Sequence, residues 1–216
     1  MTTSTKKLYA LIVGIDEYLT HIPITNSCRF GRLGGCVNDA TNVFNYLQSE
    51  SGFELHPLFL KNNEATKSNV IDGFRNHLSQ AQAGDVALFY YSGHGIQEEA
   101  DTNLWPTETD GRLESLVCYN EDGNNCLIAD KELRYLIHLV ANGTVEKPKE
   151  KSPHLVTIFD CCHSGDNTRN GDFFKKKNKT LERRISCVAR QRSWEGFTFH
   201  DEKVMRRSGF FNCLRI

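Results

Sequence analysis

Long apolar runs are missing from this sequence, and with them the usual sign of a membrane protein. No run approaches the roughly 18 apolar residues that a membrane span needs. The apolar run Leu8–Ile15 is too short and too early for the core of a secretory signal. The sequence therefore predicts a cytoplasmic protein without membrane contact.

An excess of charge of either sign is also missing. The 26 Lys and Arg against 27 Asp and Glu leave a formal charge of −1, so the whole chain offers nothing that would attract nucleic acid. In a reducing cytoplasm, the eight cysteines are read as free thiols and not as a disulfide framework. Thiols are thus available for chemistry.

Two common ligand motifs are absent as well. The glycine-rich stretch Gly31–Gly35 lacks the Gly-Lys-Ser/Thr ending of a phosphate loop and does not directly follow a strand. The three consecutive residues Cys161, Cys162 and His163 do not easily present a tetrahedral face to zinc, and no second pair lies at finger spacing. We therefore predict neither a nucleotide nor a metal site from these residues.

Apolar runs of strand length alternate with amphipathic patterns of helical length. The predicted strands are Lys7–Gly14, Leu55–Leu60, Val86–Tyr91 and Leu155–Phe159. The predicted helices carry apolar stripes at Ala40, Val43, Phe44 and Leu47, at Val70, Ile71, Phe74, Leu78 and Ala81, and at Leu133, Leu136, Ile137 and Val140. This alternation predicts an α/β fold, a mostly parallel sheet covered by helices on both faces.

Local signals suggest how the helices begin. The first helix is expected near Ala40, after Asn38 and Asp39; the second follows a cap at Thr66 or Ser68, and the third opens at Asp130. Between the third strand and the third helix, turn signals predict a short hairpin strand at Ser115–Tyr119.

Two sharp turns follow predicted strands and carry reactive side chains. Tyr-Ser-Gly-His-Gly occupies 91–95, and Asp-Cys-Cys-His-Ser-Gly occupies 160–165. The carboxyl ends of parallel strands meet at one sheet edge, where sites form. Thiol-dependent peptide hydrolysis needs a thiolate, an imidazole and N–H donors for the oxyanion. His94 and Cys162 are the candidates for the first two, and the amides of Gly95 and Cys162 for the third.

These motifs resemble the metacaspase and orthocaspase branch of the caspase-like peptidases, whose pattern is Ser-Gly-His-Gly followed by Asp-x-Cys-His-Ser-Gly. Residues 10–15 and 33–40 also look like that family's first strand and its turn into the first helix. The resemblance implies a three-layer caspase-like sandwich with Cys162 as nucleophile and His94 as base. It covers roughly residues 7–165.

The resemblance also implies where substrate binds. The matching positions in metacaspases, Asp39, Ser92 and Asp160, line an acidic pocket, so protein or peptide substrates would be cut after Arg or Lys. The plainer alternatives are that Asp39 caps a helix, that Asp160 bonds within its own turn, and that Ser92 satisfies backbone groups. No cofactor is needed for this chemistry.

Two features depart from the family pattern. We expect residues 1–166 to form the large-subunit catalytic domain and 167–216 a basic linker or tail, with the small-subunit region absent or supplied separately. Many metacaspases use calcium, and Glu108, Asp110 and Asp130 fall near the matching segments, but Ala129 stands where an adjacent Asp is expected.

The basic stretch Arg169–Arg192 is a predicted autoprocessing region. The rival hypothesis is a non-catalytic scaffold or inactive fragment.

Overall fold

A four-stranded parallel sheet forms the centre of the computed structural model, which describes residues 5–22, 29–99, 112–121 and 126–161. Its strands are β1 (Lys7–Gly14), β2 (Glu54–Lys61), β3 (Val86–Ser92) and β7 (His154–Asp160), in the order β2-β1-β3-β7. All neighbouring pairs are parallel. The four predicted strands are confirmed, each to within one residue at either end.

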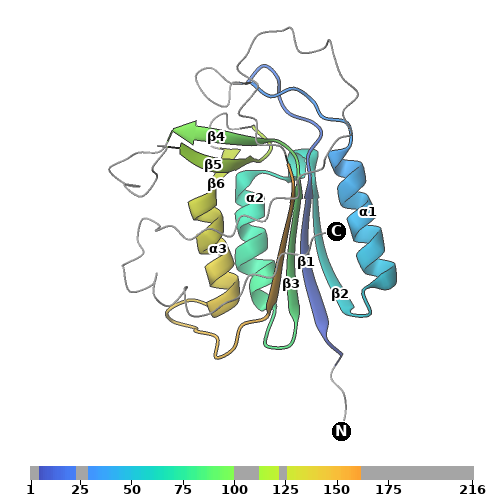
Figure 1. Ribbon diagram of the computed structural model, residues 1–216, viewed down its shortest axis with the longest axis vertical. Coiled ribbons are helices and arrows are strands. Elements are labelled where there is room, and N and C mark those ends of the chain that lie inside the picture. The colour runs from blue at the N-terminus through green and yellow to red at the C-terminus, as the bar shows by residue number, and fades with distance from the viewer. Residues whose placement is uncertain (1–4, 23–28, 100–111, 122–125, 162–216) are drawn as a thin grey trace.

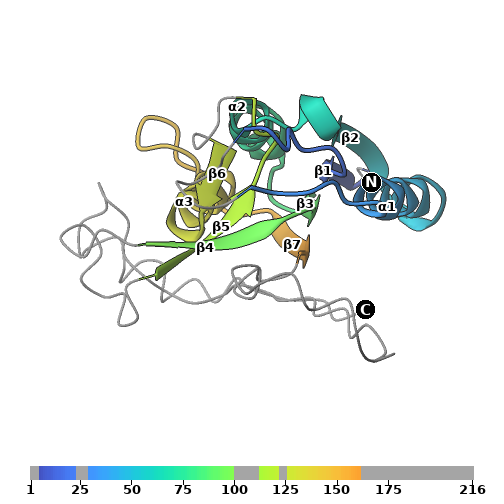
Figure 2. The ribbon, with the colours of Figure 1, turned by 90° about the horizontal axis from the view of Figure 1, so that it is seen from above.

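Helices cover both faces of this sheet. Helix α1 (Cys36–Glu50) lies on one face, and α2 (Lys67–Asp72) and α3 (Asp130–Asn142) lie on the other (Figures 1 and 2). The second apolar stripe does not form one regular helix, because α2 continues into a π-helical turn at Gly73–His77 and a 3₁₀ turn at Leu78–Gln80. The predicted three-layer α/β sandwich is confirmed.

The central strands are buried on both faces, which explains their continuous apolar sequences. In β1, Leu8, Ala10 and Ile12 pack in the core under α1, whereas the alternate residues pack in the larger core under α2 and α3. Each Leu, Ile or Val buried in this way contributes about 1.5–3 kcal/mol to the free energy of unfolding. The centre of the sheet is therefore a rigid base for the loops at its edge.

A second, antiparallel sheet follows β3 along the chain. It contains β4 (Gly95–Glu99), β5 (Arg112–Val117) and β6 (Leu127–Ala129), in that order. The predicted strand Ser115–Tyr119 was only partly right, because β5 begins at Arg112 and ends at Val117. Among the helices that the structure describes, none is long and apolar enough to cross a bilayer.

Candidate active site

The carboxyl ends of three central strands meet in register. Ser92, the last residue of β3, lies opposite Gly14 of β1 on one side and Asp160 of β7 on the other. The amide of Ile15 donates to the carbonyl of Ser92 at 3.0 Å, which ties the exits of β1 and β3 together. The chain after Ser92 leads to His94, and the chain after Asp160 leads to Cys162, which lies outside the described residues.

Hydrogen bonds fix the backbone of His94 on both sides. Its amide donates to the hydroxyl of Tyr18 at 3.0 Å. Its carbonyl accepts from the hydroxyl of Tyr91 at 2.7 Å and from the amide of Val117 at 3.0 Å. The Tyr18 hydroxyl in turn donates to the carbonyl of Val117 at 3.1 Å. Three segments distant in sequence thus determine where the imidazole stands.

The imidazole of His94 is held in one tautomer. Nε2 lies 2.9 Å from the carbonyl oxygen of Gly31, and a carbonyl can only accept, so Nε2 carries the proton and donates it. Nδ1 is buried, has no hydrogen-bond partner in the described part of the chain, and in the neutral ring keeps its lone pair. The arrangement leaves Nδ1 ready to accept a proton.

Aromatic rings enclose this imidazole. Its centroid lies 4.5 Å from that of Phe30 and 4.8 Å from that of Tyr18, and the residue is 7% exposed. Burial lowers the pKa of His94 below its ordinary value, although the bond to Gly31 raises it. His94 is therefore neutral near pH 7, as a general base must be.

Gly93 is required by close packing and not by backbone conformation. A Cβ atom at this position would lie 2.7 Å from the hydroxyl of Tyr91 and 2.8 Å from that of Tyr18, the two groups that hold His94. A side chain of any size at residue 93 would displace these phenols and the histidine with them.

We expect Gly93→Ala to lower the free energy of unfolding by about 1–3 kcal/mol, the usual cost of overpacking. Chemical denaturation measures this change. Gly34→Ala is the matched control, because a Cβ there has no atom within 4 Å, and it should stay within about 0.5 kcal/mol of wild type. Equal stability of the two variants would show that the side chains of Tyr18 and Tyr91 move aside without lowering the free energy of unfolding.

The three predicted pocket residues share one face of this edge, the α1 face. Tyr90, which precedes Ser92 by two residues on β3, reports their proximity. The pKa of Tyr90 is raised, first by burial and then by the carboxylate of Asp160; a hydrogen bond with Ser92 lowers it, and the carboxylate of Asp39 raises it further. Ser92 is therefore within hydrogen-bonding distance of this hydroxyl, and the carboxylates of Asp39 and Asp160 are close enough to raise its pKa.

Cys36 belongs to the same group. Burial raises the pKa of its thiol to about 11, a hydrogen bond with Ser92 lowers it, and the carboxylates of Asp16 and Asp160 raise it. Burial first, and the negative charge at this face second, thus keep this thiol protonated. By contrast, Cys161 packs against the core on the opposite face of the sheet.

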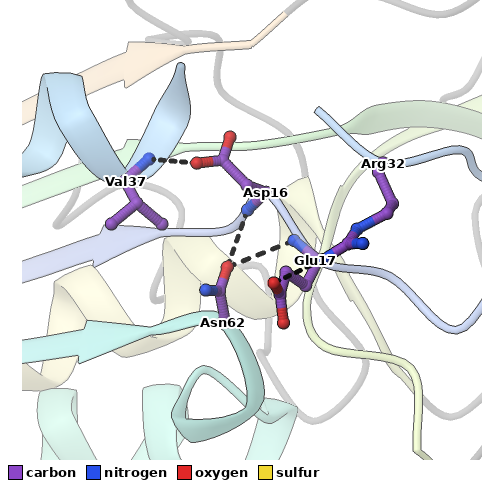
Figure 3. Close-up of polar contacts among 5 residues, drawn as sticks. All are labelled: Asp16, Glu17, Arg32, Val37 and Asn62. Atoms are coloured by element: carbon purple, nitrogen blue, oxygen red, sulfur yellow. Dashed lines mark hydrogen bonds and ion pairs between the residues drawn. The ribbon is translucent and has the colours of Figure 1, made fainter. Parts of the chain in front are cut away.

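The idea that Asp39 caps a helix near Ala40 is wrong. Helix α1 begins at Cys36, so Asp39 lies within the first turn of the helix. The N-cap residue of α1 is Gly35, which has no side chain. The cap comes from Asp16, whose carboxylate accepts from the amides at the start of the helix, among them Val37 at 3.1 Å (Figure 3).

Gly95 opens β4 opposite Leu116, directly after the histidine. Its predicted partner in the oxyanion hole, the amide of Cys162, lies outside the described residues. The residues that sequence reasoning missed are Asp16, Tyr18, Gly31 and Cys36. Only Cys36 carried a local signal, as a cysteine beside Asp39, because the others act through contacts between segments far apart in sequence.

Three acidic residues lie near the segments that bind calcium in many metacaspases, although no calcium site was predicted. Glu108 and Asp110 lie outside the described residues. Asp130 begins α3, and its Oδ2 accepts from the ammonium of Lys131 at 2.5 Å; Lys131 is 1% exposed. The other oxygen, Oδ1, is buried and has no hydrogen-bond partner in the described part of the chain, and calcium needs about 6–8 oxygen ligands. Within the described residues no three metal-binding side chains form a group.

The site indicates the class of this protein, and comparison with known proteins gives its family. A buried histidine follows one strand of a parallel sheet, and the carboxylates of Asp39 and Asp160 lie at the same edge of that sheet, an arrangement suited to a peptidase. Residues 7–169 match the family profile described as metacaspase, peptidase C14 domain. The chain belongs to the metacaspase family of cysteine peptidases.

The relatives are similar over most of this chain but are longer. Metacaspase III c of Phaeodactylum tricornutum is 31% identical over 163 residues, which cover 72% of this chain and 42% of that protein. Metacaspase-1 of Kluyveromyces lactis is 26% identical over 166 residues, covering 72% and 33%. The chain thus spans less than half the length of these relatives.

A solved structure supports the fold. A crystal structure of a protein from Geobacter sulfurreducens is similar with a TM-score of 0.56 at 26% identity, over 75% of this chain and 53% of that one. The likeness agrees with the caspase-like arrangement of a mostly parallel sheet between helices.

Proposed function

We propose that this chain supplies the catalytic region of an endopeptidase that cuts after Arg or Lys through a dyad of Cys162 and His94. The observation that carries the proposal is the buried Nδ1 of His94, which has no hydrogen-bond partner among the described residues, in a ring whose other nitrogen is bonded to Gly31. A base in this state takes a proton without first losing one.

The proposed reaction is acyl transfer to sulfur. The Cys162 thiol passes its proton to His94, and the thiolate attacks the carbonyl carbon of the scissile peptide. Gly95 and Cys162 donate amide protons to the oxyanion, and His94 then protonates the leaving amine. Water, deprotonated by His94, hydrolyses the thioester and restores the thiol. No cofactor enters these steps, and we propose that calcium is not required.

The proposed specificity rests on the negative potential of the α1 face. Asp39 and Asp160 contribute carboxylates, and the raised pKa of Tyr90 and of Cys36 follows in part from that charge. An Arg or Lys side chain would form charge-assisted hydrogen bonds there, whereas an acidic side chain would meet like charge. Ser92, 1% exposed, would supply a hydroxyl at the base of the pocket.

A protein partner is proposed at the free edge of the central sheet. In the described part of the chain, β7 pairs only with β3, so its other edge offers unpaired backbone groups. We propose that a small-subunit segment adds there, and that the enzyme acts on the basic stretch Arg169–Arg192 of its own chain in the cytoplasm.

The test is hydrolysis of two fluorogenic peptides that differ only in Arg or Asp before the cleaved bond, each with and without calcium. We expect turnover of the Arg peptide alone, unchanged by calcium and absent in Cys162→Ala. Cleavage of the Asp peptide would refute the specificity. No turnover by a folded sample, with or without a small-subunit segment added, would favour the scaffold hypothesis.

A further inference from the structure

Asp16 lies just beyond the end of β1, and both its carboxylate and its backbone accept hydrogen bonds from the segment at the start of α1. Its Oδ1 accepts from the amides of Gly35 at 2.9 Å and Cys36 at 2.8 Å, and its Oδ2 accepts from Val37 at 3.1 Å. Hydrogen bonds to a carboxylate are stronger than those between neutral groups, and a negative charge at a helix N-terminus is favourable. One side chain thus holds the start of α1.

The backbone of Asp16 holds the loop before that helix. Its carbonyl accepts from the amide of Leu33 at 2.8 Å. The loop is therefore attached to Asp16 at Leu33 and again at Gly35. Gly31, whose carbonyl bonds the imidazole of His94, is only two residues before the first attachment.

Asp16 is itself held by a third segment. Oδ1 of Asn62, directly after β2, accepts from the amides of Asp16 at 2.9 Å and Glu17 at 3.1 Å (Figure 3). Asn62 has a φ of 47°, in the left-handed region that Asn tolerates better than most residues. The exposed ion pair between Glu17 and Arg32 links the same two loops, but exposed pairs contribute little.

We infer that Asp16 is a positioning residue that holds both the bond between Gly31 and His94 and the carboxylate of Asp39 in place. The inference rests on the proposed function for its catalytic consequence, although its geometry does not. Without the carboxylate, the stretch from Gly31 to Val37 loses its attachments at Gly35, Cys36 and Val37 and keeps only the one at Leu33. Gly31 then releases Nε2 of His94, and the first turn of α1, with Asp39, shifts away from Ser92.

The consequence for the histidine is a mixed tautomer. While Gly31 accepts from Nε2, the proton stays there and Nδ1 remains basic. Once that bond is lost, the two neutral tautomers of an imidazole become comparable in population, and water reaches the ring. Loss of the bond to Gly31 removes a contribution that raises the pKa of His94, but the entry of water removes the larger contribution of burial, which lowers it. On balance the pKa rises toward its ordinary value of 6.5.

The test compares Asp16→Asn, Asp16→Ala and the control Asp72→Asn, all in the full chain carrying Cys162→Ala. Asp72 is an exposed carboxylate on α2. Nitrogen-15 NMR of the histidine rings reports the tautomer and pKa of His94 without any need for turnover. We expect the Nε2–H form alone in the parent, a mixture and a raised pKa in Asp16→Ala, a smaller change in Asp16→Asn, and none in Asp72→Asn.

The same substitutions with Cys162 restored give the catalytic arm. A displacement of about 1 Å costs on the order of 100-fold in rate, so kcat for the Arg peptide should fall about 100-fold in Asp16→Ala and about tenfold in Asp16→Asn, with KM raised in both. If Asp16→Ala fails to fold, the NMR and kinetic results for Asp16→Asn alone test the inference.

Folded Asp16 variants with the parent tautomer and pKa would overturn the inference, as would equal changes in Asp72→Asn. If the parent chain hydrolyses no peptide at all, the proposed function fails while the NMR comparison still decides the role of Asp16. The two failures are therefore distinguishable.

Discussion

Replacing His94 by glutamine is expected to lower kcat/KM for an Arg peptide by about 10³-fold to 10⁴-fold, the upper part of the range for loss of a general base. A glutamine amide can donate to the carbonyl of Gly31 and fill the space between Tyr18 and Phe30, but it has no basic lone pair. The fold should therefore survive while proton transfer is lost. Steady-state kinetics beside a thermal unfolding curve measures both.

The pH profile provides a second signature of the same residue. The neutral imidazole is the base, so kcat/KM falls on the acid side as His94 takes up a proton. Because burial lowers the pKa of His94, this acid limb lies below pH 6.5 and activity has reached its plateau near pH 7.5. A folded His94→Gln protein with wild-type turnover, or with the same acid limb, would show that another group accepts the proton.

The central sheet is predictable from sequence because its strands contain apolar runs of strand length, which in β1 and β3 are buried on both faces. Lys7–Gly14 is one such run, and the structure places a strand on those same residues. The shorter strands β4 and β6 are not predictable in this way. Gly95–Glu99 ends in polar residues and Leu127–Ala129 has three residues, so both depend on pairing with β5 and not on their own pattern.

The start of α1 shows why local signals misplace an element. Asp39 is a good capping residue by type, and the prediction of a helix beginning near Ala40 follows from it. The real cap, Asp16, lies 20 residues before Cys36 in sequence and reaches it only through the fold. A pattern restricted to neighbouring residues has no access to such a contact.

The same distinction between local signals and long-range contacts applies to the candidate site. His94 follows from a motif at a strand end, and the pocket residues follow from the family resemblance; in the structure Asp39, Ser92 and Asp160 all act on the hydroxyl of Tyr90. Their roles as base and pocket stay predictions. The group that orients the histidine is the backbone carbonyl of Gly31, so the residue type at this position does not indicate its role. The position of Cys162 lies outside the described residues.

Neutralising Asp160 is the second large change. We expect Asp160→Asn to lower kcat/KM for the Arg peptide by about 10²-fold to 10³-fold, since breaking a desolvated charge pair costs about 3–5 kcal/mol and each 1.4 kcal/mol is a factor of ten. The amide keeps the volume and one acceptor but loses the charge. The loss should fall mainly on KM if the pocket binds ground state and transition state alike.

A spectroscopic control separates loss of charge from loss of structure. Asp160 is one cause of the raised pKa of Cys36, about 11, so Asp160→Asn should lower that pKa, which NMR of labelled cysteines follows in the Cys162→Ala background. Asp72→Asn should change neither this pKa nor the kinetics. If Asp160→Asn lowers the pKa of Cys36 yet leaves Arg hydrolysis unchanged, the carboxylate lies near Cys36 without binding the substrate, and specificity must arise elsewhere.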